Sequence, residues 1–311
     1  MTKVKNYLSL IKFSHTIFAM PFALIGFFLG LMSFDYAVSL VPGWHSPSDP
    51  HFTFPAFLSG TEIVKKLLLV ILCMIFARSA AMAFNRWLDA KYDAQNPRTA
   101  VREIPAGIIT PKNALLFVII NSVLFIGATF FINPLCFYLS PVALFVVLFY
   151  SYTKRFTALC HLVLGLGLSL APIGAYIAVT GVFNLLPLLF SLAVLCWVSG
   201  FDVIYALQDE EFDKSQQLHS IPAAVGKSNA LRISEGLHVL SAASVIYAGY
   251  YGHFGWLYWC GVAVFLGLLI YQHLLVKPND LSRVNMAFFT SNGIASIVFA
   301  AFVIADIFLS K

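Results

Sequence analysis

The sequence predicts an all-α polytopic membrane protein, and three features lead to this fold class. The chain has 311 residues, of which 60% are hydrophobic and only 11% are charged. Ordinary soluble domains carry about 25% charged residues, and a soluble domain of this size must still present a large surface to water. The apolar residues also gather in runs of about 20, the length of a helix that crosses a bilayer. These features exclude a soluble globular enzyme, a disordered chain and a disulfide scaffold.

Nine apolar stretches are expected to cross the membrane, each as one α-helix. They lie near residues 14–33, 62–84, 113–132, 135–150, 159–180, 184–207, 230–250, 255–275 and 286–309. The stretches are apolar all round, whereas a membrane β-barrel needs alternating apolar and polar residues. We therefore expect a single domain over residues 1–311, with its helices bundled around a central cavity open to the cytoplasmic side. Its cap loops are expected near 85–112, 151–158 and 208–230.

The basic residues predict how the bundle lies in the membrane. Of the 19 Lys and Arg residues, 15 fall before the first stretch or in alternate connections such as 85–112 and 151–158. Because Lys and Arg gather on the cytoplasmic side, the N-terminus should be cytoplasmic and the C-terminus external. No Arg-rich, acid-poor transit segment precedes the first stretch, so a bacterial inner membrane is expected. The connection 34–61 is interpreted as a packed cap or a segment lying on the membrane surface.

Several classes of ligand find no support in the sequence. The five cysteines are widely spaced and form no CxxC pair, so neither a zinc site nor a disulfide framework is expected. No basic stripe with interleaved aromatic residues appears, so no nucleic-acid partner is expected. The eight histidines, among them His161 and His219, form no ligand-like pattern and are interpreted as structural or interfacial residues.

The first of two acidic segments begins at the end of the second predicted span. Asn85, Asp89 and Asp93 are four residues apart, which stacks them on one face of a helix. Three oxygen-bearing side chains in a column are typical of a site for a hard cation such as Mg²⁺. The alternative is a salt-bridged helix end, with Arg86 and Lys91 as the partners.

The second acidic segment begins at the end of the sixth predicted span. Asp202, Asp209 and Asp213 are spaced by seven and four residues, again on one helical face, with Tyr205 adjacent to it. Two such columns at the ends of different helices are hard to explain as acidic loops that simply face water. Charged groups at membrane depth are by default functional. If the two helices face each other, they form a two-sided carboxylate cage. Such a cage suits Mg²⁺ bound through one or two carboxylates per ion and a substrate diphosphate.

A diphosphate site also needs cations, and the neighbouring loops supply them. Arg98 and Arg102 follow the first column, and Lys154 and Arg155 come from the next cytoplasmic loop. Arg suits bidentate contact with phosphate, and Lys supplies a point charge. Ordinary positive-inside loop charge is the alternative for some of them. Arg78 lies about two turns deeper on the face of the first column.

These residues form four motifs. They are Asn85-x3-Asp89-x3-Asp93, Asn96-x-Arg98-x3-Arg102-x2-Pro105-x-Gly107, Tyr150-x3-Lys154-Arg155 and Asp202-x2-Tyr205-x3-Asp209-x3-Asp213. Together with the nine-span layout, they resemble the UbiA superfamily of intramembrane prenyltransferases over most of the chain. There is one departure, because many relatives have Asn-Asp where this chain has Asn85-Arg86. This variant is similar to the 4-hydroxybenzoate-polyprenyltransferase-like branch, some members of which serve a menaquinone pathway.

The resemblance implies Mg²⁺-dependent transfer of a polyprenyl group from polyprenyl diphosphate to an aromatic acid such as 4-hydroxybenzoate, in ubiquinone or menaquinone biosynthesis. It implies two groups of binding residues. The metal ligands are Asn85, Asp89, Asp93, Asp209 and Asp213. The diphosphate ligands are Arg98, Arg102, Lys154 and Tyr150.

Three further residues are implied to act on the acceptor. Asp202, with Tyr205 beside it, activates or orients the acceptor. Arg78 pairs with an acceptor carboxylate or, alternatively, with a carboxylate of the cage.

Other functions remain open at this point. In the alternatives from the same enzyme class, the acceptor is a naphthoate, a homogentisate, a tetrapyrrole or a lipid glycerol. The rival from another class is a cation-coupled secondary transporter. Transporters place their ion sites near the bilayer midplane on broken helices, whereas these columns lie at helix ends, which favours the enzyme. The oligomeric state has no signal in the sequence.

Overall fold

The computed structural model describes residues 3–11, 19–39 and 58–309, and in these ranges the chain forms helices and no β-strand. The helices are α1 Lys3–Leu10, α2 Met20–Ser39, α3 Gly60–Leu88, α4 Ala90–Gln95, α5 Pro111–Phe130, α6 Pro134–Thr153, α7 Cys160–Thr180, α8 Leu185–Ala206, α9 Glu210–Ser215, α10 Ile221–Tyr251, α11 Trp256–Leu275 and α12 Asn292–Leu309. A 3₁₀ turn, η2 (Leu207–Asp209), precedes α9, and a π-helical segment, η3 (Met286–Ser291), precedes α12. The predicted all-α class is confirmed.

Local sequence signals explain where the long helices begin and end. Ser59 and Glu62 form a capping box at the start of α3. Thr110 caps α5 with Pro111 at the first helical position, as its sequence predicts. Gly181 ends α7 with a φ of 72°, in the left-handed region that glycine adopts without strain. These devices satisfy backbone groups that have no partner within the helix.

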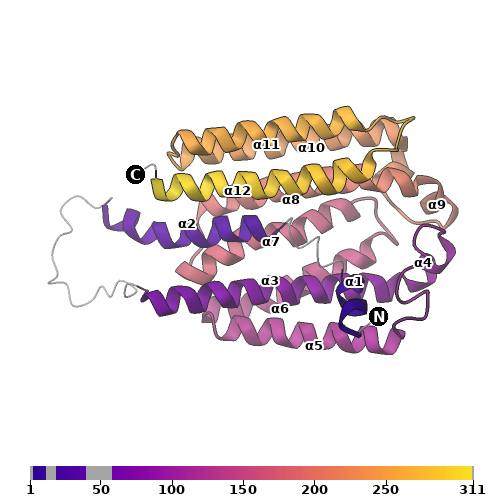
Figure 1. Ribbon diagram of the computed structural model, residues 1–311, viewed down its shortest axis with the longest axis horizontal. Coiled ribbons are helices and arrows are strands. Elements are labelled where there is room, and N and C mark those ends of the chain that lie inside the picture. Colours follow the sequence, from indigo (N-terminus) through magenta and orange to yellow (C-terminus); the bar gives the residue numbers. More distant parts are fainter. Residues whose placement is uncertain (1–2, 12–18, 40–57, 310–311) are drawn as a thin grey trace.

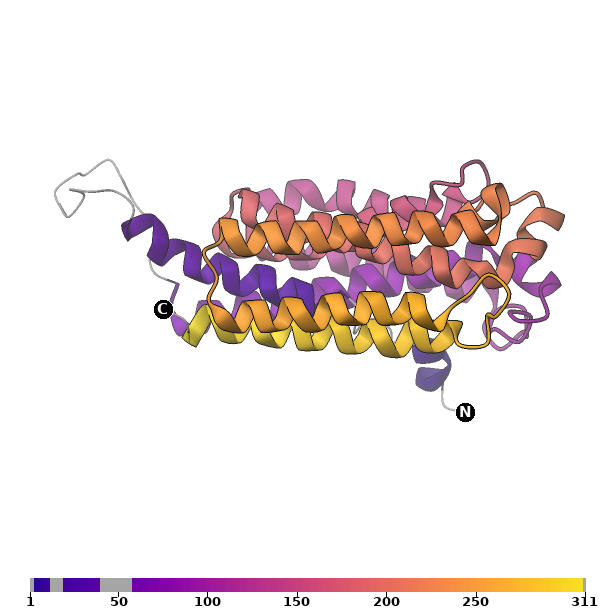
Figure 2. The ribbon, with the colours of Figure 1, turned by 90° about the horizontal axis from the view of Figure 1, so that it is seen from above.

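The long helices run side by side along the longest axis of the molecule (Figures 1 and 2). Helix α8 lies at the centre of the bundle and packs mainly against α7 and α10. Its residue Trp197 is fully buried, and its indole N–H donates to Asn292 at the start of α12, 2.9 Å away. Phe265 of α11 packs beside this indole, and Phe190 of α8 and Phe299 of α12 belong to the same buried cluster. The burial of these large rings holds α8, α11 and α12 together.

Seven of the described helices are long and apolar enough to cross a membrane. They coincide with the second to sixth, eighth and ninth predicted stretches. The first stretch lies partly outside the described residues, and its apolar helical part runs over Met20–Met32. The seventh lies within α10, which is broken at Gly226, where φ is 77° and ψ is 165°, so that its long part begins after this kink and close to the predicted start at 230. The total of nine therefore stays a prediction, as does the interpretation of 34–61, because residues 40–57 lie outside the described ranges.

Both acidic columns are interrupted, which corrects the prediction that each lies on one continuous helix. Helix α3 ends at Leu88, and Asp89 has φ −93° and ψ 6° before α4 begins. Helix α8 ends at Ala206, and Asp209 has φ −104° and ψ 3° before α9 begins. In each motif the middle aspartate therefore lies at a joint between a long helix and a short one. Figure 1 shows the two short helices, α4 and α9, at the same end of the bundle.

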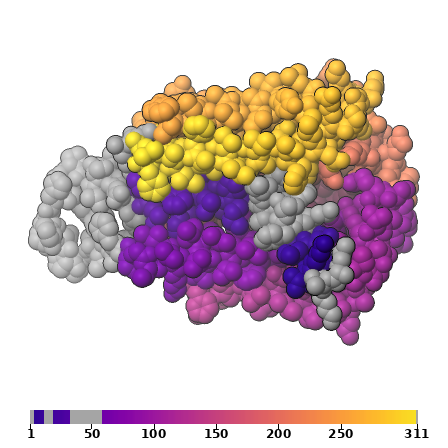
Figure 3. Space-filling model, in the orientation of Figure 1, coloured from indigo at the N-terminus to yellow at the C-terminus, as the bar shows by residue number. Residues whose placement is uncertain are grey.

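The N-terminal helix covers part of this end of the molecule. Tyr7 of α1 stacks on Phe117 of α5, with ring centroids 4.9 Å apart, and Leu10 is fully buried. The hydroxyl of Ser9 donates to the carboxylate of Glu103. Figure 3 shows α1, in indigo, lying against the surface of the neighbouring segments. Helix α1 is therefore attached to the loop that follows the first acidic motif.

Candidate active site

The two acidic motifs face one polar pocket of about 1170 Å³ at the end of the bundle that carries α4 and α9. All twelve residues that the sequence assigns to the site line this pocket: Arg78, Asn85, Asp89, Asp93, Arg98, Arg102, Tyr150, Lys154, Asp202, Tyr205, Asp209 and Asp213. They come from α3, α4, the loop after α4, α6, α8 and the η2–α9 segment. Residues far apart in the chain are thus gathered as the sequence predicts.

Asp89 is paired with a cation from another helix. Arg155, just after α6, donates to its carboxylate over 2.9 Å and to the carbonyl of Leu88 over 3.0 Å. The amide of Asn85 donates to the other carboxylate oxygen over 3.1 Å. Burial raises the pKa of the Asp89 carboxyl above its ordinary value, and the Arg155 charge limits that rise. Arg155 therefore belongs to the site, although the sequence assigned it no individual role.

Asp93 is buried between two guanidinium groups. Arg102 donates to it over 2.6 Å, whereas the nearest nitrogen of Arg86 is 4.0 Å away. Both side chains, Asp93 and Arg86, are less than one-tenth exposed. Among the described residues, Asp93 Oδ2 and two nitrogens of Arg86, Nε and Nη1, have no hydrogen-bond partner. Arg86 thus has donors left for a further anion, and the predicted partnership between it and a carboxylate is only partly formed.

Asp209 is held by the loop that follows the first motif. Arg98 donates to both of its carboxylate oxygens, over 3.2 and 2.5 Å, and the amide of Asn96 donates over 3.3 Å. The same guanidinium donates to the hydroxyl of Tyr205 over 2.9 Å. Burial alone would lower the pKa of Arg98, but these contacts with Asp209 and Tyr205 raise it above its ordinary value. This contact joins the two motifs across the pocket.

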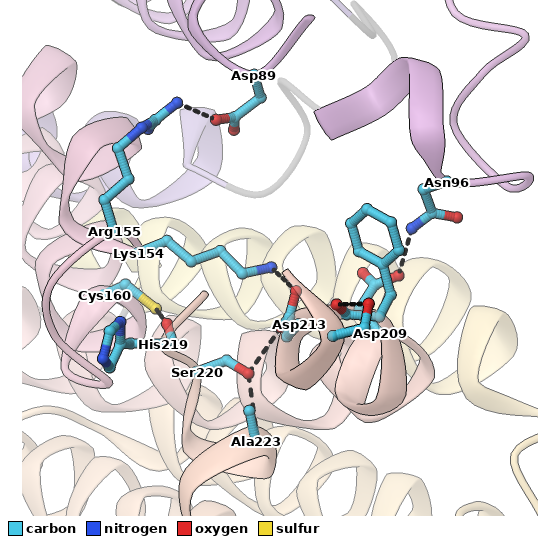
Figure 4. A network of polar contacts seen from close by, with 12 residues as sticks. Asp89, Asn96, Lys154, Arg155, Cys160, Asp209, Asp213, His219, Ser220 and Ala223 are labelled. Atoms are coloured by element: carbon cyan, nitrogen blue, oxygen red, sulfur yellow. Dashed lines mark hydrogen bonds and ion pairs between the residues drawn. The ribbon is translucent and has the colours of Figure 1, made fainter. Parts of the chain in front are cut away.

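Asp213 is fully buried and has two partners, seen in Figure 4. Lys154 lies 2.7 Å from one carboxylate oxygen, and the hydroxyl of Ser220 donates to the other over 2.8 Å. Burial alone would lower the pKa of Lys154, but the negative charge of Asp213 raises it. The backbone N–H of His219 donates to the carbonyl of Lys154 over 2.7 Å, which fixes this lysine beside the second motif.

The carboxylates therefore face cations rather than one another. In the parts of the chain that the structure describes, no three His, Cys, Asp or Glu side chains lie close enough to hold an ion by themselves. The donor set nevertheless suits Mg²⁺, which prefers one or two carboxylates completed by water and substrate phosphates. The unpartnered oxygen of Asp93 points to the same use. These oxygen donors therefore fit the ion, provided that the Arg and Lys side chains paired with them contact a diphosphate instead.

The deep end of the pocket holds a different group of polar side chains. Asp202 of α8 lies 2.7 Å from Nδ1 of His161 on α7. Arg78 lies on the same wall as Tyr150, and its Nε has no hydrogen-bond partner among the described residues. The prediction that His161 is only structural missed this contact. The two residues are 41 positions apart, and no spacing in the sequence signals that they meet.

A second, apolar pocket of about 350 Å³ lies among α3, α5, α6 and α7. It shares Arg78, Met82, Tyr150, Leu164 and Leu168 with the polar pocket, so the two spaces meet at the deep end. Few of the phenylalanines line it, and most of its wall is aliphatic. Its shape and chemistry suit a hydrocarbon chain.

The small residues of α7 serve two purposes, which are close helix packing and space beside the apolar pocket. A Cβ at Gly165 would lie 2.2 Å from the hydroxyl of Ser199, so this glycine permits close packing of α7 on α8. Gly167 and Gly174, in contrast, line the apolar pocket.

Comparison with known proteins gives a consistent result. The model of the UbiA prenyltransferase family matches residues 50–294. The 4-hydroxybenzoate octaprenyltransferase of Nitrosomonas europaea is 32% identical over 78% of this chain and 82% of that protein. The protein of the same name from Tolumonas auensis is 31% identical over 77% and 84%.

Solved structures resemble the whole bundle. The apo structure of a UbiA homolog from Aeropyrum pernix K1 superposes with a TM-score of 0.76 at 28% identity, over 94% of this chain and 98% of that one. A UbiA homolog from Archaeoglobus fulgidus, bound to DMAPP and Mg²⁺, gives a TM-score of 0.68 at 20% identity, over 98% and 99%. At 20% identity, the similarity to the Archaeoglobus fulgidus structure supports the fold alone.

Proposed function

Because the chain belongs to the UbiA prenyltransferase family, we propose that it transfers a polyprenyl group from a polyprenyl diphosphate to an aromatic acid, with 4-hydroxybenzoate as the acceptor. The observation that carries this proposal is the junction of the two pockets. A charged pocket suited to a diphosphate opens into an apolar pocket suited to its hydrocarbon tail. The acceptor of the curated relatives favours the ubiquinone pathway over the menaquinone branch.

The diphosphate binds among the cations of the polar pocket. Arg98, Arg102 and Lys154, with the Tyr150 hydroxyl, contact its oxygens, and Arg86 adds two nitrogens that have no hydrogen-bond partner in the described part of the chain. Arginine suits this task because its planar fork matches phosphate oxygens. As these cations turn to the diphosphate, the carboxylates with which they are paired become available as metal ligands.

Mg²⁺ is the cofactor we assign to the carboxylates. Its ligands would be Asn85, Asp89, Asp93, Asp209 and Asp213, which are hard oxygen donors on both sides of the pocket. When bound, the ion supplies positive charge that stabilises the departing diphosphate. The chain's own contribution is to hold the substrate so that its C–O bond lies at the junction of the two pockets.

The acceptor binds at the deep end, beside the carbon that the diphosphate leaves. Arg78 donates to its carboxylate, because the guanidinium is buried and its Nε has no hydrogen-bond partner among the described residues. Asp202 accepts a hydrogen bond from its ring hydroxyl, with Tyr205 nearby on the same helix turn. A donor at one end of the acceptor and a carboxylate at the other favour an aromatic hydroxy acid over a tetrapyrrole or a lipid glycerol. Among aromatic hydroxy acids, the acceptor named for the relatives favours 4-hydroxybenzoate over a naphthoate or homogentisate.

We propose that the whole chain, residues 1–311, is one prenyltransferase domain in a bacterial inner membrane. Membership of the family and seven long apolar helices support an integral membrane protein. Its N-terminus is cytoplasmic, its C-terminus is external, and the polar pocket opens to the cytoplasm. The gathering of Lys and Arg in the loops at this end of the bundle supports that orientation.

The test is prenyl transfer by the purified protein in liposomes, with geranyl diphosphate, Mg²⁺ and a panel of aromatic acids. We expect formation of prenylated 4-hydroxybenzoate that is abolished by EDTA and reduced, with measurable residual activity, by Asp89→Asn or Asp209→Asn. Asp280→Asn is the matched control, because Asp280 is exposed and lies outside the pocket. Diphosphate release without prenylated acid would reject this acceptor class. No binding or cleavage of the diphosphate by folded protein would reject the enzyme and favour the cation-coupled transporter.

A further inference from the structure

The contact between His161 and Asp202 lies at the deep end of the pocket, where the acceptor is proposed to bind. His161 is in the first turn of α7, and Asp202 is one turn before the end of α8. Nδ1 of the imidazole is 2.7 Å from Oδ2 of the carboxylate. The histidine side chain is only 4% exposed, whereas that of Asp202 is 23% exposed. The carboxylate is therefore more exposed to the pocket than the imidazole, which is buried against it.

The surroundings of His161 fix which ring nitrogen carries the proton. The backbone N–H of Ile221, at the first position of α10, donates to Nε2 over 3.3 Å. A nitrogen that accepts a hydrogen bond is unprotonated. The single ring proton of the neutral imidazole is therefore on Nδ1, where it is donated to Asp202. The hydroxyl of Ser199 donates to the carbonyl of His161 over 3.1 Å and fixes the backbone of the same residue.

The hydrogen bond with His161 involves one oxygen of the Asp202 carboxylate, and the second oxygen takes no part in it. Among the described residues, His161 is the hydrogen-bond partner of this carboxylate. A carboxylate held through one oxygen cannot rotate freely, so its second oxygen keeps one direction. Asp202 lines the pocket together with Arg78 and Tyr150, so that direction is set relative to the acceptor site.

We propose that His161 is a positioning residue that holds the Asp202 carboxylate so that its second oxygen receives the hydroxyl proton of the aromatic acceptor. The inference rests on the proposed function, because it requires a phenolic acceptor in this pocket. A phenol that shares its proton with a carboxylate is a stronger carbon nucleophile, since electron density moves from oxygen into the ring.

The proton balance of the step closes without a further reagent. The hydroxyl proton moves to Asp202, a ring carbon forms the new C–C bond, and the C–O bond to the diphosphate breaks with its electron pair leaving on the diphosphate. The product at this stage is a dienone. Its ring C–H proton then passes to the diphosphate, and Asp202 returns its proton to the oxygen. His161 keeps its own proton throughout.

Two substitutions of His161 distinguish a role in positioning Asp202 from a role in helix packing. His161→Leu keeps the apolar volume but removes both ring hydrogen bonds. His161→Gln keeps an N–H for Asp202 and an oxygen for the N–H of Ile221, and should therefore rescue the function. His238→Leu is the matched control, because His238 is equally buried and hydrogen-bonded but does not line the pocket.

The kinetic test uses geranyl diphosphate, Mg²⁺ and 4-hydroxybenzoate. We expect His161→Leu to lower kcat/KM for the acceptor by about 100-fold, the low end of what a positioned base supplies. The KM for geranyl diphosphate should stay within about twofold, and His161→Gln should recover most of the loss. With the more acidic 3-fluoro-4-hydroxybenzoate, the loss in His161→Leu should shrink. Wild-type acceptor kinetics in His161→Leu, or an equal loss in His238→Leu, would overturn the proposal.

A spectroscopic measurement tests the same idea without turnover. In protein labelled with ¹⁵N-histidine, the signal that disappears in His161→Gln should show a neutral ring with its proton on Nδ1. Its chemical shift should change in Asp202→Asn. A protonated imidazolium, or a proton on Nε2, would overturn the proposal. If the wild type cleaves geranyl diphosphate but prenylates no phenol, the proposed acceptor is wrong, and this spectrum alone then decides the positioning contact.

Discussion

The two acidic motifs share a design but differ in their electrostatic surroundings. In both, a long helix ends just before the middle aspartate, and a short helix carries the last one. The first motif lies beside two buried guanidinium groups, those of Arg78 and Arg86, that have nitrogens without a hydrogen-bond partner among the described residues. The second lies beside further acids, because Glu211 and Asp202 add carboxylates, and of its acidic neighbours Glu210 is paired with Lys214.

The difference indicates a division of labour across the pocket. Surplus positive charge on the first side favours the diphosphate, and surplus negative charge on the second side favours the cation. The same carboxylate spacing therefore serves different ligands according to its neighbours. The four predictions below test this division, beginning with the largest expected effect.

Asp213→Asn should have the largest effect. It leaves Lys154 without its charge partner, and because the Lys154 side chain is 32% exposed, we expect a cost of about 1–3 kcal/mol, below that of a fully buried ion pair. We expect a clear drop in thermal stability and a loss of prenyl transfer of about 100-fold or more. Thermal unfolding in detergent and product formation measure the two effects. A variant as stable and as active as the wild type would remove the second motif from the site.

Arg86→Gln tests the anion side. Two nitrogens of this side chain, Nε and Nη1, have no hydrogen-bond partner among the described residues, and a hydrogen bond to a charged group is worth about 1.5–3 kcal/mol. We expect the KM for prenyl diphosphate to rise by about tenfold or more, with the Mg²⁺ requirement little changed. Arg232→Gln, on the exposed face of α10, is the control. An unchanged KM would mean that Arg86 only supports Asp93.

The cation side is tested by comparing Asp209→Asn with Asp89→Asn at residual activity. Asp89 is beside Arg155 and near Lys154, whereas Asp209, which is paired with Arg98, also has acidic neighbours in its own segment. We expect the Mg²⁺ concentration for half activation to rise about fivefold more in Asp209→Asn, a difference of about 1 kcal/mol. Equal shifts in the two variants would contradict the division of labour.

The smallest effect concerns pH. Burial raises the pKa of Asp89, so this carboxyl takes up its proton at a higher pH than an ordinary aspartate. The folded state holds the proton more tightly than the unfolded state, so the stability from protonated Asp89 is fully present below the unfolded pKa and is lost as the pH rises from there through the folded pKa. Removing the Arg155 charge in Arg155→Gln raises the pKa of Asp89 further. The acid limb of kcat/KM should therefore move to higher pH. A limb that stays in place would show that Asp89 does not control it.

Much of the fold was readable from local sequence. The Thr110–Pro111 start of α5 and the apolar runs of α7 and α11 predict helices, because backbone capping and burial are local properties. The break at Asp89 was missed, since a spacing of four residues fits a continuous helix as well as a jointed one. The short helical segment at the start of α10, from Ile221 to Val225, was missed because it is too short to count as a span and a kink at Gly226 separates it from the long part.

The candidate site was predictable in its residues but not in its pairings. By themselves the residues determine an all-α membrane protein, two aspartate motifs at helix ends and a supply of cations, because hydrophobicity and periodicity depend only on local sequence. The tertiary structure decides that Arg98 meets Asp209 and that Lys154 meets Asp213. It also brings His161 to Asp202 and leaves two nitrogens of Arg86 without a hydrogen-bond partner within the described ranges. Pairings between charges depend on which helices pack together, and the burial of large apolar side chains around Trp197, rather than the charges, sets that packing.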